Sequence, residues 1–288
     1  MRIAILSINI GAYDIFWSDF YSSAEENFIC DCLEKEYFVF TDSTDIKAEK
    51  EKVHVYYQED MGWPNNTMKR FMFIYNIKDE LQNFDYIFFV NANALFQEKL
   101  TSDFINRRKN IIVIEHPGFH LYKPEDKPFE TREESFAFVH EKDRRMYVQG
   151  AFYGGKTDYF LQMVDFLNKR TEEDLERGII AVWHDESFLN AYVAGRNDVQ
   201  ILGWQYLYFD EYVLPYARTI VLRDKRKYLT NKNGRFLNEN FFKKRMLIKL
   251  RNLKWKILIF LKVYKYESIK DSEGNYIGNN IQSIFEDP

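Results

Sequence analysis

The apolar run at residues 86–90, Tyr-Ile-Phe-Phe-Val, constrains the fold most, because it stops abruptly on two amides. Its β-branched and aromatic residues are typical of a buried strand. Asn91 and Asn93 follow it directly, separated by one alanine. Ligands of open α/β sheets bind where loops leave the carboxyl ends of strands. Two carboxylates here would hold a divalent cation, whereas amides hydrogen-bond a ligand but are poor metal anchors. The alternative is an asparagine-rich turn without function.

Strand and helix patterns alternate on both sides of this run. Upstream, the patterns predict strands at residues 2–8, 37–41 and 53–57, a helix at 18–32, and a second helix with its N-cap at Asn66 or Thr67. Downstream, they predict strands at 111–114, 147–155 and 220–222, a helix at 157–177, and a long loop at 121–146. Such alternation predicts an α/β fold whose sheet is mainly parallel.

Composition limits the function classes. The chain has 288 residues, 46% hydrophobic residues and a formal net charge of −4, which fit a globular protein and argue against a nucleic-acid binder. Cys30 and Cys32 are the only cysteines, too few for a disulfide framework, so we expect a reducing, cytoplasmic compartment. The first residues form a strand pattern without the long apolar region of a signal peptide. No run reaches the roughly 18–20 apolar residues of a membrane span.

Polar residues at helix and strand ends are candidates for a site. Lys69 and Arg70 lie in the first turn of a predicted helix, where cations oppose the helix dipole. Either an anionic partner faces them or they form a solvated pair. His116 and His120 have the spacing of a helical metal pair, but the Pro-Gly dipeptide between them excludes the helix that a zincin-type site needs.

A further ionisable cluster follows the apolar run at residues 179–183. His184, Asp185 and Glu186 either belong to a site or form the first turn of a helix, where acidic side chains complement the dipole. The last predicted strand opens onto a basic run at residues 223–227.

The composition shifts beyond residue 230. Nine basic residues and no acidic one occur from Lys243 to Lys265. Apolar residues share one helical face there, as in a basic amphipathic helix at a membrane surface: Met246, Leu250, Leu253, Ile257, Phe260, Leu261 and Tyr264. Residues 266–288 are polar and predict a poorly ordered tail. We therefore expect a main domain at 1–230 and, at 231–288, a basic helical extension with a polar tail.

Seven short motifs, each weak alone, occur in the order found in one family. They are Gly11-Ala12-Tyr13-Asp14-Ile15-Phe16-Trp17, the run GWPNNTMKRF at 62–71, Phe89-Val90-Asn91-Ala92-Asn93, His116-Pro117-Gly118-Phe119, the run GAFYGG at 150–155, Trp183-His184-Asp185-Glu186-Ser187, and Leu222-Arg223-Asp224-Lys225. Together they resemble glycosyltransferase family 6, which contains the blood-group A and B transferases and the α-1,3-galactosyltransferase. The resemblance extends from residue 3 to about residue 227.

The resemblance implies a GT-A glycosyltransferase fold, a Rossmann-like mixed sheet flanked by helices, with residues 1–230 as the catalytic domain. It also implies a retaining transfer of galactose (Gal) or N-acetylgalactosamine (GalNAc) from a UDP-sugar to the 3-OH of a galactoside glycan or glycolipid. Vertebrate members carry Asp-x-Asp and need manganese. The Asn91-Ala92-Asn93 form is similar to the bacterial subgroup that works without metal, so no metal or other cofactor is expected. Lys225 and its basic neighbours would then stabilise the diphosphate leaving group.

The motif positions imply a role for each site residue. The implied donor-binding residues are Tyr13, near the uracil, and Arg70, Asn91, Asn93, Asp185 and Lys225. His116 and Trp183 would line the acceptor site, Trp183 by stacking on a sugar face. Gln149 and Ala151 would face the C2 substituent of the donor sugar, and their size favours UDP-Gal over UDP-GalNAc. Glu186 would sit below the anomeric carbon, either stabilising an oxocarbenium-like transition state or acting as a covalent nucleophile.

Two other functions stay open from the sequence. Loss of the Asp-x-Asp motif is compatible with a non-catalytic, sugar-binding relative. The basic amphipathic helix is compatible with a peripheral membrane protein. The presence of Glu186 and Lys225 favours the enzyme over both.

Overall fold

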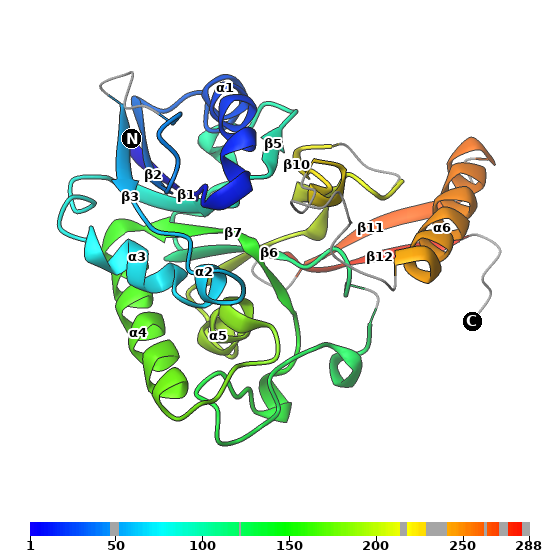
Figure 1. Cartoon of the computed structure of the whole chain (residues 1–288). Helices are drawn as coiled ribbons and strands as arrows, with labels where there is room; N and C mark the ends of the chain where they lie inside the picture. The colour runs from blue at the N-terminus through cyan, green and yellow to red at the C-terminus, as the bar shows by residue number, and fades with distance from the viewer. Residues whose placement is uncertain are drawn as a thin grey trace.

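A seven-stranded sheet forms the centre of the protein, in the order β3-β2-β1-β4-β7-β6-β8 (Figure 1). Its strands are β1 (Arg2–Ile8), β2 (Glu34–Thr41), β3 (Val53–Tyr57), β4 (Tyr86–Val90), β6 (Ile111–Glu115), β7 (Val148–Lys156) and β8 (Val199–Leu202). The computed structural model describes residues 1–46, 52–120, 122–213, 218–228, 241–261, 264–270 and 276–283.

The sheet is mainly parallel, as predicted. β1 pairs in parallel with β2 and β4, β2 with β3, and β6 with β8. β7 runs antiparallel to its neighbours β4 and β6. Every residue of β4 and β6 is buried, as expected for strands covered on both faces. This mixed sheet, flanked by helices, confirms the GT-A-like architecture.

Helices cover the two faces of the sheet (Figure 1). On one side lies α1 (Trp17–Asn27), preceded by the short 3₁₀ helix η1 (Gly11–Phe16); on the other lie α3 (Arg70–Asn76), α4 (Thr157–Glu176) and α5 (His184–Val193). Each side has its own apolar core. In β1, Ala4 and Leu6 belong to the core under α3–α5, and Ile3 and Ile5 to the core under α1, because side chains alternate along a strand.

A small second sheet brings the last strand of the main domain next to β4. It contains β5 (Ala94–Phe96), β10 (Ile220–Leu222) and β9 (Leu207–Phe209), with β10 in the middle. Leu222 pairs with Ala94, so the basic run after β10 lies beside the Asn-Ala-Asn turn after β4. The predictions missed β5, β8 and β9, which have three or four residues each, although they included the equally short β10.

Two predicted helix boundaries are wrong. α1 ends at Asn27, not near residue 32, because Lys35 of β2 donates hydrogen bonds to the carbonyl oxygens of Ala24 and Glu25 at 2.8 and 2.7 Å. The second helix begins as α2 (Asn65–Met68) after Pro64, which is its N-cap, and no side chain caps it. A break at Lys69 makes Arg70 the first residue of α3.

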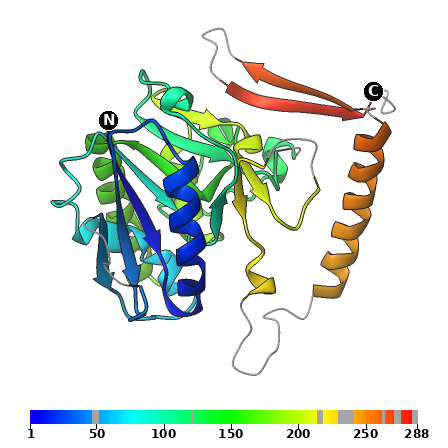
Figure 2. The same cartoon turned by 90° about the horizontal axis from the view of Figure 1, so that it is seen from above.

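The C-terminal part contains a helix and a hairpin beside the main sheet (Figure 2). α6 (Phe241–Leu261) confirms the predicted helix. β11 (Tyr264–Lys270) and β12 (Tyr276–Ser283) pair antiparallel, so a poorly ordered tail is wrong for these residues, and Tyr264 does not extend the apolar face of α6. Residues 271–275 and 284–288 of the expected tail lie outside the described residues. None of the helices in the described ranges is long and apolar enough to cross a membrane.

Candidate active site

Arg70 joins four elements at the carboxyl end of β4. Its Nη1 donates to the backbone oxygen of Gly150 in β7 at 2.6 Å and lies 2.8 Å from Asp185 Oδ2 in α5. Its Nη2 donates to Asn91 Oδ1 at 3.4 Å, and its guanidinium lies 4.3 Å from the centre of the Phe89 ring. Arg70 is buried, so protein groups replace solvent around its charge. One side chain therefore ties α3, β4, β7 and α5 together.

Asp185 is the anionic partner of Arg70, one of the two alternatives that the sequence left open. Both side chains are buried, and the pair neutralises two charges that would be costly alone. Burial raises the pKa of Asp185, and the Arg70 charge opposes that rise. Asp185 and Glu186 do lie in the first turn of α5, as the alternative interpretation held, but they also point to β7 and α3.

Glu186 lies next to this pair. Its Oε2 accepts a hydrogen bond from the Gly150 backbone N–H at 2.7 Å. The residue keeps some exposure to solvent, yet its carboxylate is closely surrounded by protein. This burial raises the pKa of Glu186 to about 7, with a further contribution from the Asp185 charge, against the Gly150 hydrogen bond. A carboxyl group of this kind changes charge near neutral pH.

Gly150 has no side chain where the two acids approach β7. A Cβ there would lie 3.3 Å from Glu186 Cβ and 3.4 Å from Asp185 Oδ2, tighter than most side-chain contacts. Small residues in a strand allow a close approach, and here the approach is by α5. The buried Tyr147 hydroxyl lies beside Glu186, and both burial and the Glu186 charge raise the pKa of Tyr147.

Asn93 holds the other side of the Asn-Ala-Asn turn. Its Nδ2 donates to the backbone oxygen of Arg223 at 2.8 Å, and its backbone oxygen accepts from the Arg223 backbone N–H at 3.0 Å. Its Oδ1 is buried without a hydrogen-bond partner among the described residues. Asn91 instead accepts from Arg70. The turn thus links the Arg70–Asp185–Glu186 cluster to the basic run after β10. No group of three His, Cys, Asp or Glu residues suited to a metal ion occurs in the described ranges.

The basic run contains cations with different partners. Arg223 is buried and paired with Asp19 at 2.7 Å, and Lys227 is paired with Asp210 at 2.5 Å. Lys225 forms no ion pair within the described part of the chain, and its Nζ lies 5.5 Å from the centre of the Tyr13 ring. The side chain of Arg226 lies outside the described residues. The structure therefore leaves Lys225 available beside Tyr13.

The two residues predicted to bind the acceptor, His116 and Trp183, directly follow β6 and directly precede α5. His116 follows β6, and its ring centre is 5.9 Å from that of Tyr147. Burial lowers the pKa of His116 to about 3, and its Nδ1 accepts from the Gly118 backbone N–H, so the ring is neutral. Trp183 immediately precedes α5 and is 47% exposed, as a sugar-stacking indole requires.

The two predicted selectivity residues flank Gly150 in β7. Ala151 is buried, and its backbone oxygen accepts from the Asn91 N–H at 2.9 Å. Gln149 is half-buried, and its Oε1 accepts from the Ala151 backbone N–H. Both therefore lie within one residue of the glycine that contacts Glu186.

All these residues lie within one region of similarity to known proteins. The sequence model of the family described as "Glycosyltransferase family 6" matches residues 1–238. The chain belongs to glycosyltransferase family 6. This confirms the resemblance drawn from the ordered motifs. The main sheet and all the predicted site residues fall within the matched region.

Individual family 6 proteins show different degrees of similarity. The "O-antigen biosynthesis glycosyltransferase WbnI" of Escherichia coli is 35% identical over 229 residues, which are 79% of this chain and 96% of that protein. The "Histo-blood group ABO system transferase 2" of Rattus norvegicus is 24% identical over 72% of this chain and 63% of its own length. The "Globoside alpha-1,3-N-acetylgalactosaminyltransferase 1" of Homo sapiens is 23% identical over 73% of this chain and 62% of its own length.

The predictions missed two residues near this family 6 site. Tyr147 was interpreted only as part of a strand, because nothing in its neighbours indicates that its hydroxyl lies beside Glu186. Glu130 lies in the long polar loop among other acids, so its sequence context does not distinguish it. In the structure it is buried and holds the segment that leads to Trp183.

Proposed function

We propose that this family 6 glycosyltransferase moves Gal or GalNAc from a UDP-sugar to the 3-OH of a galactoside glycan or glycolipid, forming an α-1,3 linkage with retention of configuration. The observation that carries the proposal is the Glu186 carboxylate, which the Gly150 N–H holds beside the Arg70–Asp185 pair. An α-1,3-GalNAc transferase among the relatives supports the linkage by its name.

We infer separate tasks for the two sides of the Asn-Ala-Asn turn. In this proposal, Arg70 and Asp185 on one side offer polar groups to the hydroxyls of the donor sugar. Glu186 faces the anomeric carbon, where its negative charge stabilises the positive charge that develops as the UDP bond breaks. On the other side, Lys225 and Tyr13 take the diphosphate and the uracil. Mass spectrometry of enzyme trapped during turnover distinguishes a covalent glycosyl bond to Glu186 from stabilisation by its charge alone.

The decisive assay supplies UDP-Gal or UDP-GalNAc with fucosylated and unfucosylated galactosides. We expect UDP release and a new product whose anomeric proton has the α configuration by NMR. A product of β configuration would contradict retention. Tight UDP-sugar binding without UDP release would instead identify a non-catalytic, sugar-binding relative.

Metal independence is the first specific prediction. Because Asn91 and Asn93 lack the carboxylates that hold a cation, transfer should persist in excess EDTA, and added manganese should change the rate little. Lys225 would supply the positive charge instead. Lys225→Ala should weaken UDP binding about 10- to 100-fold, as for loss of a charged hydrogen-bond donor, and should lower kcat as well. Calorimetric UDP titration and initial rates measure both effects.

Lys227→Ala is the matched control. It removes the same charge two residues away, from a side chain that already pairs with Asp210. We expect its Kd for UDP to stay within about threefold of the wild type. Activity that is lost on chelation and restored by manganese would contradict the first part of the prediction. Equal losses at Lys225 and Lys227 would contradict the second.

Donor choice gives the second prediction. Ala151 and Gln149 favour the smaller C2 substituent, so kcat/KM should be higher with UDP-Gal than with UDP-GalNAc. Ala151→Gly should shift this ratio toward UDP-GalNAc by about 1–3 kcal/mol, which is roughly 5- to 150-fold. The ratio is independent of the fraction of folded enzyme, which matters because Ala151 is buried. A wild-type preference for UDP-GalNAc would refute the assignment.

We also propose that the protein works in the cytoplasm at the inner face of the membrane, with α6 resting on anionic lipid. Six apolar side chains on one side of α6 are 49–84% exposed: Met246, Leu250, Leu253, Ile257, Phe260 and Leu261. Exposed Lys249, Lys254 and Lys256 border this stripe. The opposite side packs on the protein, where Asn252 Oδ1 accepts from the Val213 N–H at 3.0 Å. Apolar insertion and lysine attraction therefore act on one surface.

Vesicle binding gives the third prediction. The protein should bind phosphatidylcholine vesicles that contain phosphatidylglycerol, more weakly as salt rises, and bind pure phosphatidylcholine poorly. Leu250→Glu should reduce binding at least about tenfold without changing transfer to a short soluble acceptor. Leu33→Glu, at an apolar residue 80% exposed on the main domain, is the control and should bind normally. Equal binding by both variants would exclude α6 as the contact.

A further inference from the structure

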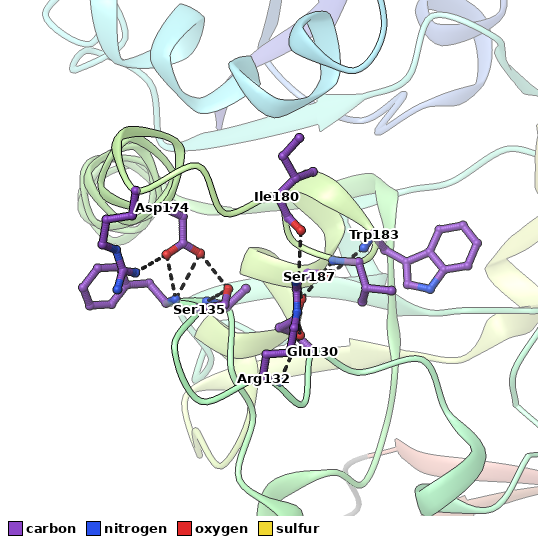
Figure 3. Close-up of polar contacts among 11 residues, drawn as sticks. Glu130, Arg132, Ser135, Asp174, Ile180, Trp183 and Ser187 are labelled. Carbon is purple, nitrogen blue, oxygen red and sulfur yellow. Dashed lines mark hydrogen bonds and ion pairs between the residues drawn. The ribbon is translucent and has the colours of Figure 1, made fainter.

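The long loop between β6 and β7 is anchored to the segment that leads to Trp183 (Figure 3). Glu130, from this loop, is 2% exposed, and its Oε2 accepts a hydrogen bond from the Val182 backbone N–H at 2.9 Å. Arg132, two residues further, donates from Nη2 to the backbone oxygen of Ile180 at 2.7 Å. Glu130 and Arg132 thus each hold one backbone group of a segment that belongs to no helix or strand. We call this pair of side chains the clamp.

The two clamping side chains also bind each other. Arg132 donates from Nη2 to Glu130 Oε2 at 2.6 Å and from Nε to Glu130 Oε1 at 2.9 Å, in a bidentate arrangement. Burial opposes the charge of Glu130, but the donors from Arg132 and Val182 outweigh it and keep its pKa below the usual range. The carboxylate is therefore ionised and accepts every hydrogen bond, which fixes its orientation.

The clamp holds the backbone of Val182, the residue directly before Trp183 with its exposed indole. The Val182 peptide is held by Glu130, and the Trp183 N–H donates to Ser187 Oγ in α5 at 2.9 Å. The Trp183 backbone oxygen accepts from the Glu186 N–H at 3.1 Å, so backbone groups on both sides of the Trp183 Cα are held. Its side chain stays 47% exposed. Fixing the backbone limits the directions in which the indole can point, which is the condition for stacking on a sugar face.

We propose that Glu130, together with Arg132, is a positioning residue for the acceptor: it sets the orientation of Trp183 and so the affinity for the acceptor sugar. The proposal rests on the proposed stacking role of Trp183. Glu130 touches neither the donor-binding residues nor Glu186. Its loss should therefore weaken acceptor binding and leave the handling of the UDP-sugar unchanged.

Asp174, near the end of α4, offers a matched control because it anchors the same loop. It is as buried as Glu130, and it accepts from Ser135 Oγ at 2.6 Å and from the Phe136 N–H at 3.1 Å. It therefore anchors the loop to the C-terminal part of α4 (Figure 3), and its side-chain hydrogen bonds go to Ser135, Phe136 and Arg177. A general loosening of the loop should result from Asp174→Asn as well as from Glu130→Gln.

The kinetic test compares Glu130→Gln, Asp174→Asn and Trp183→Ala. For Glu130→Gln we expect the acceptor KM to rise about tenfold, with the donor KM and the acceptor-free hydrolysis of UDP-sugar within about twofold of the wild type. Asp174→Asn should leave the acceptor KM within about twofold. In the Trp183→Ala background, Glu130→Gln should add little, because the side chain that it positions is gone. An equal rise in acceptor KM for Glu130→Gln and Asp174→Asn, or full additivity with Trp183→Ala, would overturn the proposal.

Hydrogen exchange tests the clamp without any sugar. The Val182 and Trp183 amides should exchange faster in Glu130→Gln than in the wild type and in Asp174→Asn. Unchanged exchange in Glu130→Gln overturns the clamp, whatever the kinetics show. If Trp183→Ala leaves the acceptor KM unchanged, the stacking role is wrong and the positioning role falls with it. Absence of transfer by the wild type is a failure of the proposed function and is visible in the wild type alone.

Discussion

Glu186→Gln should lower kcat by a factor on the order of 10²–10⁴ while changing the Kd of the UDP-sugar less than about threefold. Glutamine keeps the shape of the side chain and can still accept the Gly150 hydrogen bond at 2.7 Å. It removes the negative charge that, in the proposed mechanism, stabilises the developing cation of the transition state. Single-turnover rates and calorimetric donor titration separate the two effects.

The pH profile provides a second signature of the same carboxylate. Burial raises the pKa of Glu186 to about 7. The proposed mechanism requires the ionised form. Activity should therefore rise with pH up to about 7, by roughly tenfold per unit on the acid side, and level off above it. The Gln variant should lack this acid limb. A near-normal kcat in the variant, or an acid limb that persists in it, would show that Glu186 is only an acidic residue in the first turn of α5.

Arg70→Met should destabilise the fold by about 3–5 kcal/mol, because it leaves Asp185 buried without its partner. For a protein of this size the melting temperature should fall by about 10 °C. The pKa of Asp185 is already raised by burial, and without Arg70 nothing of comparable strength opposes the rise. When the pKa of a carboxyl is higher in the folded than in the unfolded protein, the folded protein becomes less stable as pH rises. The variant should therefore be less destabilised at pH 5 than at pH 8.

Two further variants test whether the loss of stability comes from burying an unpaired charge. Arg70→Met combined with Asp185→Asn buries no unpaired charge, so most of the loss should be recovered. Arg2→Met breaks an ion pair with Glu34 at 2.7 Å, about the same length, but both side chains are partly exposed. Its melting temperature should stay within about 2 °C of the wild type. Equal losses for Arg2→Met and Arg70→Met, measured by calorimetry, would contradict the argument.

The sequence by itself determined the main strands and the order of the motifs. The runs that became β1, β3, β4 and β6 are mostly apolar and rich in β-branched or aromatic residues, and local composition is enough to place such strands. Their alternation with helices was enough to predict a mainly parallel α/β sheet. The ordered motifs identified the family, because short matches at several places are specific together even when each is weak.

Only the tertiary structure decided which polar residues act together. Arg70 meets the backbone of Gly150, 80 positions away, and Asn93 meets that of Arg223, 130 positions away. The sequence could not rank Arg223, Lys225, Arg226 and Lys227, which lie within one basic run. Pairing with Asp19 and Asp210 separates Arg223 and Lys227 from Lys225.

Glu130 shows the physical reason for this limit. Three acids follow one another closely in its loop, at residues 130, 133 and 134, and nothing local distinguishes the first from the others. Glu130 becomes different because folding places it against the Val182 N–H and removes it from water, whereas Glu133 and Glu134 stay exposed. Burial, hydrogen-bond partners and pKa shifts arise from neighbours that are remote in sequence, so they are properties of the packed chain and not of the local pattern.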